Sequence, residues 1–235
     1  MRLALWTPLA GRPEVAALVS ALRQRTTLLV VEAQPPQRPE VDLDLYHLAD
    51  EERHGFAYRA LLERPGLVWL ESLSLHTLVR CCTAGRGDQA GYLREARRAH
   101  GPLGAFVARQ VLEGRGGALA ELLTFTDRVL ESALAVLSDN EVVAGGPGLE
   151  LVAVPPLSTA NAGATAEVVA ELARRLAPQA EAAALRLRDR REREKTPLGR
   201  ALQELLPFAR ELGLRQLPSG VEPLLAELFA APPRP

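Results

Sequence analysis

Side chains that could bind a polar ligand or transfer a proton gather in one stretch of the chain, between residues 44 and 79. Histidines stand at positions 47, 54 and 76, and Glu71 precedes the last of them. An imidazole changes its charge near neutral pH, and a carboxylate can accept a hydrogen bond, so these groups could line a binding cleft. A structural or surface role is the more common one for a single histidine, and it stays open for each of the three. No two of the three show the i, i+4 spacing of a helical metal site, so we expect no metal ion here.

The elements expected around these side chains form a βαβ unit. Residues 43–48 and 67–70 are predicted to be short strands, because both are apolar runs. Apolar residues at helical spacing predict a helix over 51–63, which Arg64-Pro65-Gly66 ends, and a further helix opens near residue 73. Ligands of parallel sheets bind beyond the carboxyl ends of the strands, and the three histidines fall on that side.

The remaining pattern predicts an α/β protein: a Rossmann-like parallel sheet flanked by helices in residues 1–157, followed by a helical extension in 158–235. Residues 27–32, TLLVVE, are predicted to form a buried strand, because four apolar residues stand together in it. Pro178 is expected to kink or divide the helical segment 165–195. Further strands are expected at 2–6 and 133–137, and further helices at 14–25, 89–113 with an interruption at Gly101-Pro102, and 118–131.

Composition excludes several classes of protein. A net charge of −1 gives no electrostatic case for binding nucleic acid or an anionic membrane. No apolar run approaches the length of about 18 residues that a membrane span requires, and the N-terminus lacks the features of a signal peptide. We therefore expect a soluble, cytoplasmic protein. The adjacent cysteines, Cys81 and Cys82, cannot supply the spacing of a metal site, and Lys195 is the only lysine, which excludes lysine chemistry in the core.

The segment YHLADEERHGFAYRALLERPGLVWLESLSLHTLV, residues 46–79, resembles the N-terminal half of bacterial GT-B glycosyltransferases of the retaining, family 4 type. That half carries the family's acceptor side. The likeness spans roughly residues 1–157. It also includes the opening strand and loop at 3–9, an RGD…YL pattern at 86–93, the strand end at 137–141 and the strand with its proline at 151–156. Residues 197–229 bear a weaker similarity to the helical tail of some of these enzymes.

The resemblance implies that a second Rossmann-like domain with the nucleotide-sugar donor site should follow. Only 78 of the 235 residues remain after residue 157, and they show neither strand alternation nor a Gly-rich strand-to-helix turn. A donor domain would need on the order of 150 residues. We therefore expect the donor half to be missing from this chain.

The resemblance also implies which residues line an acceptor cleft: Thr7, Arg12, His47, His54, Glu71, Ser72 and His76. Glu71-Ser72 replaces the family's His-Asp pair, although His76 keeps its family position. Glu14 stands where a glycine-containing loop would approach a phosphate, and its charge would repel one. We expect acceptor chemistry to be changed or lost, and we assign no catalytic residue and no cofactor.

Three functions remain open. The first is a pseudoenzyme, inactive alone, that binds or regulates a complete glycosyltransferase through its C-terminal helices. The second is the acceptor-binding half of a split glycosyltransferase that another chain completes, and the third is an interaction module unrelated to sugar. A homodimer is also possible. The first hypothesis predicts that apolar residues of the tail cover the surface left by the missing domain. These are Leu172, Leu176, Leu202, Leu205, Leu206 and Phe208.

Overall fold

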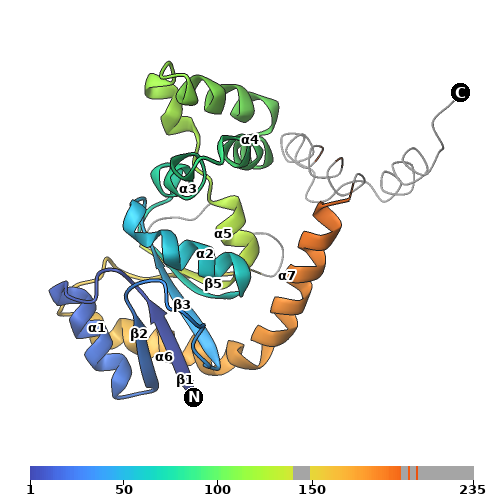
Figure 1. The fold of residues 1–235 in the computed structure, drawn as a ribbon. Helices are drawn as coiled ribbons and strands as arrows, with labels where there is room; N and C mark the ends of the chain where they lie inside the picture. The colour runs from blue at the N-terminus through green and yellow to red at the C-terminus, as the bar shows by residue number, and fades with distance from the viewer. Residues whose placement is uncertain (140–148, 197–200, 202–204, 206–235) are drawn as a thin grey trace, which may run out of the picture. The chain divides into compact units, whose positions relative to one another are not determined.

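The fold is built on a sheet of six parallel strands, seen here in a computed structural model of the chain (Figure 1). The structure describes residues 1–139, 149–196, 201 and 205. Along the sheet the order is β2-β1-β3-β4-β5-β6. The strands are β1 (Arg2–Trp6), β2 (Thr27–Val31), β3 (Leu43–Leu48), β4 (Gly66–Leu70), β5 (Ala133–Ser138) and β6 (Glu150–Ala153). This arrangement confirms a Rossmann-like α/β fold.

The strand order reverses between β1 and β3. From β1 the chain first runs outward to β2 at the edge and then returns to place β3 on the other side of β1. The loops that leave β1 and β3 therefore diverge, and in open α/β sheets ligands bind in the crevice at such a switch point. Thr7 directly follows β1, and His47 is the penultimate residue of β3.

Helices account for most of the remaining described residues, including those at the C-terminal part of the fold. The helices are α1 (Pro13–Arg23), α2 (Gly55–Glu63), α3 (His76–Cys82), α4 (Gln89–Leu112), α5 (Asp127–Ser132), α6 (Ala162–Leu176) and α7 (Ala180–Glu194). A 3₁₀ turn at Ala177–Gln179 separates α6 from α7, so the prediction that Pro178 divides this segment is confirmed. Among the described residues, no helix is long and apolar enough to cross a membrane.

The single helix expected over 118–131 is wrong. A 3₁₀ helix, η3 (Gly117–Leu122), and α5 occupy this region, with a break between them. Within the break Phe125 has a φ of 58°, a left-handed conformation that a continuous right-handed helix cannot contain. The apolar spacing of this segment therefore belongs to two short helices and not to one long helix.

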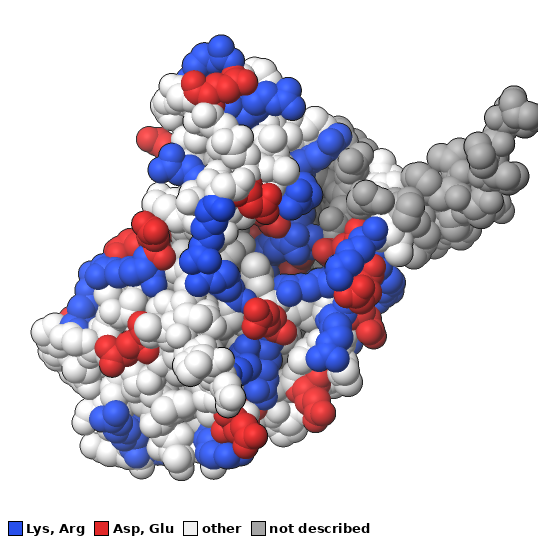
Figure 2. Space-filling model, viewed as in Figure 1, with Lys and Arg blue, Asp and Glu red and all other residues white. Residues whose placement is uncertain are grey.

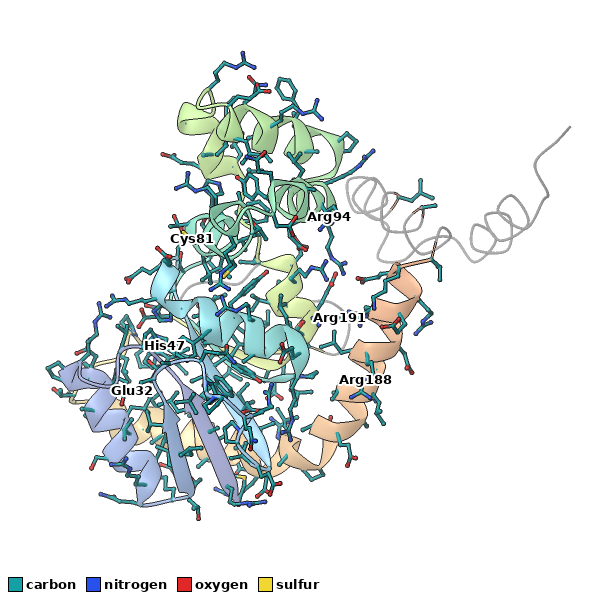
Figure 3. All side chains as sticks on the ribbon, viewed as in Figure 1. Glu32, His47, Cys81, Arg94, Arg188 and Arg191 are labelled. Atoms are coloured by element: carbon teal, nitrogen blue, oxygen red, sulfur yellow. The ribbon has the colours of Figure 1, made fainter. Side chains whose placement is uncertain are left out.

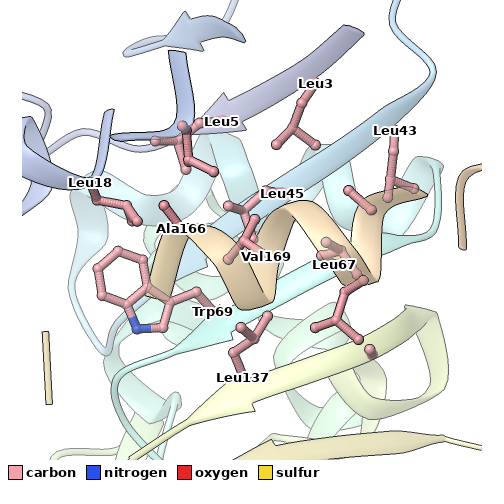
Figure 4. Close-up of a cluster of buried hydrophobic side chains, with 14 of the residues drawn as sticks. Leu3, Leu5, Leu18, Leu43, Leu45, Leu67, Trp69, Leu137, Ala166 and Val169 are labelled. Atoms are coloured by element: carbon pink, nitrogen blue, oxygen red, sulfur yellow. The ribbon is translucent and has the colours of Figure 1, made fainter. Parts of the chain in front are cut away.

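One face of the sheet is covered by α1 and α6 (Figure 4). Pro13 occupies the first helical position of α1, where its missing N–H costs no hydrogen bond. Leu172 and Leu176 of α6 pack into this core against the sheet and α1, so they cover a face of the sheet itself. Of the other tail residues expected to cover apolar surface, Leu205 is described only as a partly buried helical residue. Leu202, Leu206 and Phe208 lie outside the described residues.

The prediction that residues 27–32 form a buried strand is wrong in its burial. The segment does form β2, but Thr27 and Leu29 are exposed, and Leu28 and Val30 are only partly buried. The reason is the place of β2 at the end of the sheet, with β1 as its one neighbouring strand among the described residues. A continuous apolar run is typical of a central strand, so this edge is unusual.

The chain divides into two compact units. The first comprises Met1–Cys82 and Thr126–Leu187 and holds the whole sheet, and because α6 belongs to it, this unit continues past residue 157. The second comprises Thr83–Phe125 and Arg188–Pro235. Within it, α4 departs from helical geometry at His100 and Gly101, which confirms the expected interruption there. An ion pair of 3.0 Å between Arg98 Nη1 and Glu194 Oε1 ties α4 to the end of α7.

Candidate functional site

The carboxyl ends of three neighbouring strands bring Thr7, His47 and Glu71 into one series of close polar contacts. Thr7 Oγ1 lies 2.8 Å from His47 Nδ1, and His47 Nε2 lies 2.9 Å from Glu71 Oε1. Thr7 follows β1 and Glu71 follows β4, while His47 projects from β3 between them. The side chains of Thr7 and His47 are fully buried (His47 is labelled in Figure 3). The sequence-based expectation that these residues lie at one edge of the sheet therefore matches their geometry.

The partners of His47 assign its tautomer. The carboxylate of Glu71 can only accept a hydrogen bond, because the pKa of Glu71 is lowered, so His47 Nε2 carries the proton. In the neutral ring, Nδ1 is then an acceptor and receives the hydroxyl proton of Thr7. The backbone N–H of Leu9 donates to the same hydroxyl oxygen at 3.1 Å. Nδ1 of His47 is consequently hydrogen-bonded within the protein, and Nε2 lies at ion-pair distance from Glu71.

Of the three side chains Thr7, His47 and Glu71, only that of Glu71 reaches solvent. Its side chain is 31% exposed, and Arg12 Nη1 lies 4.0 Å from Glu71 Oε2. The interaction with His47, followed by the charge of Arg12, lowers the pKa of Glu71 despite its partial burial. Arg12 also faces Glu14, with 3.9 Å between Arg12 Nε and Glu14 Oε1. The guanidinium is thus shared between two carboxylates, which weakens it as a binder of phosphate.

Aromatic rings hold His47 in place. Its imidazole stacks on the ring of Trp69, with centroids 4.2 Å apart and an interplanar angle of 11°. On another side, His54 meets it edge to face at 5.0 Å. A buried imidazole packed in this way has little freedom to turn toward a ligand.

His54 is buried beside His47 and is held neutral. Its Nδ1–H donates to the backbone carbonyl of His47 at 2.8 Å. Burial lowers the pKa of His54 from 6.5 to about 4, which the hydrogen bond to that carbonyl only partly offsets. Its Nε2 is buried and has no hydrogen-bond partner among the described residues. At neutral pH His54 therefore acts as an uncharged packing group that fixes the backbone of β3.

Ser72 and His76, also expected in the cleft, have local environments of their own. The hydroxyl of Ser72 donates to the carbonyl of Ser74 at 2.8 Å and accepts from its N–H at 3.2 Å, so it stabilises the turn that follows β4. His76 opens α3, where burial lowers its pKa, and the nearby charge of Asp50 opposes that shift. Asp50 also accepts from the N–H of Leu78 at 2.9 Å. These contacts are those of a turn and a helix start.

A second polar cluster, at the amino end of β3, was missed by the sequence analysis. Asp44 is fully buried and accepts from Trp6 Nε1 at 2.7 Å and from Arg38 Nη2 at 2.9 Å. Arg38 also contacts the hydroxyl of Tyr46, and its guanidinium lies 5.3 Å from the centre of the Trp6 ring. The signal in the sequence was an acidic residue between two leucines in an expected strand. Because its charge is fully paired, we assign this cluster a structural role.

A pocket of about 510 Å³ lies elsewhere in the first unit. It is formed by α1, β2 and the loop after β1, and none of the expected cleft residues lines it. Its polar lining comes from Ser20, Arg23, Gln24 and Glu32, all of which are exposed. No cluster of three or more His, Cys, Asp or Glu able to hold a metal ion occurs among the described residues.

Comparison of the chain with family models, with curated proteins and with solved structures found no match. What the chain does must follow from its own residues and their geometry.

Proposed function

We propose that this chain is a glycosyltransferase-like protein that does not transfer sugar by itself and that binds or regulates a complete glycosyltransferase. The observation that carries the proposal is the series of contacts between the side chains of Thr7, His47 and Glu71. A group that orients or deprotonates an acceptor hydroxyl must have a free position within hydrogen-bond reach of that hydroxyl. Nδ1 and Nε2 of His47 already lie 2.8 Å from Thr7 Oγ1 and 2.9 Å from Glu71 Oε1, so protein groups occupy both positions.

The charges near the start of α1 support the same proposal. A helix N-terminus binds phosphate when its backbone N–H groups are approachable and no negative charge competes. Glu14 lies in the first turn of α1, and Pro13 removes one of the N–H donors. Arg12, the basic residue of this loop, faces Glu14 and Glu71. Departing diphosphate would find little stabilisation here.

A protein partner would have a highly charged helix to contact. Figure 2 shows basic and acidic side chains intermixed along α7, and Arg188 and Arg191 of this helix are labelled in Figure 3. Intermixed charge gives specificity and association rate more than affinity. We place the partner contact on α7 because this helix carries most of the charged run of residues 186–195.

The proposal is tested in two steps with the purified chain. UDP-, GDP-, ADP- and TDP-sugars are first added singly, and the melting temperature and the release of nucleoside diphosphate are measured. We expect neither a shift nor release, because a ligand of the folded state must raise the melting temperature. A shift together with release that Glu71→Gln abolishes would overturn the non-catalytic assignment.

The second step measures transfer by a complete family 4-type glycosyltransferase from the same organism, with and without the chain. We expect the rate or the stability of that enzyme to change, and the change to weaken when the exposed Arg188 is replaced by Glu. Exposed Arg25→Glu, far along the sequence from α7, serves as the matched control. No effect at any ratio would contradict a regulatory role and favour an interaction module unrelated to sugar.

One observation favours the second candidate, an acceptor-binding half of a split enzyme. The side chains of Glu71 and Arg12 are 31% and 43% exposed, so two charged groups beside the buried His47 remain accessible to a ligand. In that case transfer would appear only when a chain with a donor domain is added, and Glu71→Gln would abolish it. A regulator would instead change the rate of an enzyme already active alone.

A further inference from the structure

The outer edge of β2 is an apolar strand with which no other strand of the described residues pairs. Natural edge strands are kept from pairing with other chains by charged side chains, proline, bulges or short length. β2 reads Thr-Leu-Leu-Val-Val, without charge or proline, and Leu29 is 45% exposed. The opposite edge strand, β6, is a residue shorter and begins with Glu150, which Arg175 holds at 2.6 Å. The edge at β6 therefore carries a charged residue that the edge at β2 lacks.

The backbone of β2 offers a complete set of hydrogen-bonding groups at this edge. In a parallel pair, alternate residues turn both their N–H and C=O toward the neighbouring strand. Thr27 N–H donates to the carbonyl of Met1 at 3.1 Å, and the carbonyl of Val31 accepts from Thr7 N–H at 3.0 Å. Residues 27, 29 and 31 thus face β1, which directs the N–H and C=O groups of Leu28 and Val30 outward.

We propose that β2 pairs with β2 of a second copy of this chain, antiparallel and about a two-fold axis, so that the two sheets become continuous. Leu28 of each copy then faces Val30 of the other in a hydrogen-bonded pair, and Leu29 faces Leu29 in the close, non-hydrogen-bonded pair between them. This register satisfies all four outward groups of each strand. A register shifted toward the N-terminus would need the N–H of Thr26, which already donates to the carbonyl of Leu22 at 2.9 Å.

Charges at the two ends of β2 match this arrangement. Glu32 directly follows the strand, and Arg23 ends α1 before it; both border the pocket between α1 and β2 (Glu32 is labelled in Figure 3). Antiparallel pairing places the end of one strand beside the start of the other. Glu32 of each copy therefore approaches Arg23 of its partner, and the apolar strand between them brings no like charges together. A second copy is thus electrostatically complementary to this edge.

The proposal does not depend on the proposed function, and charge exchange at Leu29 tests it. Sedimentation velocity or light scattering after size exclusion measures the mass of the wild type, Leu29→Lys, Leu29→Glu and an equimolar mixture of these two variants. Because position 29 faces itself across the axis, like charges there oppose pairing and opposite charges restore it. Leu29 is exposed, so both variants should fold. Leu151→Lys on β6, where the leucine is 39% exposed, is the matched control.

We expect the wild type and Leu151→Lys to be dimers, each single variant at position 29 to be a monomer, and the mixture to return to a dimer. Circular dichroism confirms that the monomeric variants remain folded. A wild type that stays monomeric at 100 μM or above overturns the proposal. So does a Leu29→Lys variant that dimerises like the wild type, or a mixture that fails to recover, since either result places the interface away from this edge.

Discussion

His47 Nε2 lies 2.9 Å from Glu71 Oε1, and this contact joins the carboxyl ends of β3 and β4 beside the switch point between β1 and β3, where an α/β sheet would bind its ligand. On the other side of the ring, Thr7 closes the chain from the end of β1. A crevice that is open in ligand-binding sheets is here filled by the protein's own polar groups. We therefore expect the contact to stabilise the fold, and its removal to lower the free energy of unfolding.

Glu71→Ala should lower the free energy of unfolding by about 1–3 kcal/mol, because it leaves the buried N–H of His47 without an acceptor. Glu71→Gln is the control, since its amide oxygen can still accept that hydrogen bond, and it should lose clearly less. Urea unfolding curves of the three proteins measure the difference. Equal stability of Glu71→Ala and the wild type would mean that the contact contributes nothing.

Stability should fall as the pH is lowered from about 6.5 to about 4. The pKa of His54 is about 4 in the folded protein and 6.5 as the ordinary value, so in this interval the unfolded chain binds a proton that the folded chain does not. Free energy of unfolding is lost wherever the unfolded state binds more protons as the pH falls, here up to about 3 kcal/mol from His54. Urea unfolding at several pH values should show a smaller loss in His54→Gln.

Glu71 adds to acid sensitivity at lower pH. Its pKa is lowered in the folded protein, so its contribution is present above the ordinary value of 4.5 and is lost as the pH falls through the folded pKa. The loss between pH 6.5 and 4.5 therefore comes from His54 together with His76, whose pKa is also lowered, and His54→Gln isolates the part of His54. Identical pH profiles for the wild type and His54→Gln would contradict this assignment.

Asp44→Asn should lower the free energy of unfolding by about 2–3 kcal/mol, because it leaves the guanidinium of Arg38 without its buried counter-charge. The partial exposure of Arg38 keeps the loss below that of a fully buried pair. Asp42→Asn is the matched control, since its ion pair with Arg2 lies in solvent at 4.0 Å and should be worth less than about 1 kcal/mol. Tryptophan fluorescence follows both unfolding transitions, and equal losses would refute the structural role of Asp44.

Gly66→Ala should destabilise the sheet by about 1–3 kcal/mol through crowding at the start of β4. A Cβ at this position would lie 2.5 Å from the carbonyl oxygen of Asp44 and 2.8 Å from Tyr46 Cε2, both closer than van der Waals contact. At Gly11 a Cβ would meet no atom within 4 Å, so Gly11→Ala is the control and should be nearly neutral. Thermal unfolding separates the two, and similar melting temperatures would contradict the packing of Asp44 and Tyr46 against Gly66.

Much of the fold could be predicted from apolar periodicity, because short runs of apolar residues alternate with segments of helical spacing. The position of a strand within the sheet could not. Residues 27–31 carry the composition of a central strand and lie at the edge, since periodicity reports how apolar a segment is and not which strands flank it. The break at Phe125 was equally invisible, because a left-handed φ at a non-glycine residue leaves no mark in the pattern.

The candidate site could be predicted as a location but not as a network. Parallel strands end at one edge of a sheet, so the proximity of Thr7, His47 and Glu71 followed from their places after or near strand ends. Their pairing depends on the order β1-β3-β4 and on side-chain conformations, which no sequence pattern encodes. The cluster at Asp44 was missed for the same reason, since Arg38 comes from the connection between β2 and β3.

The most direct test of the central claim, that the polar edge of the sheet is closed by its own residues, is an NMR measurement of the imidazole nitrogens of His47. Long-range ¹H–¹⁵N correlations at pH 7 should show a proton on Nε2 and none on Nδ1. These signals should stay unchanged when UDP-, GDP-, ADP- or TDP-sugars, or simple sugar acceptors, are added. A proton on Nδ1, or signals that shift with ligand concentration, would show that His47 is available for binding and would contradict the non-catalytic assignment.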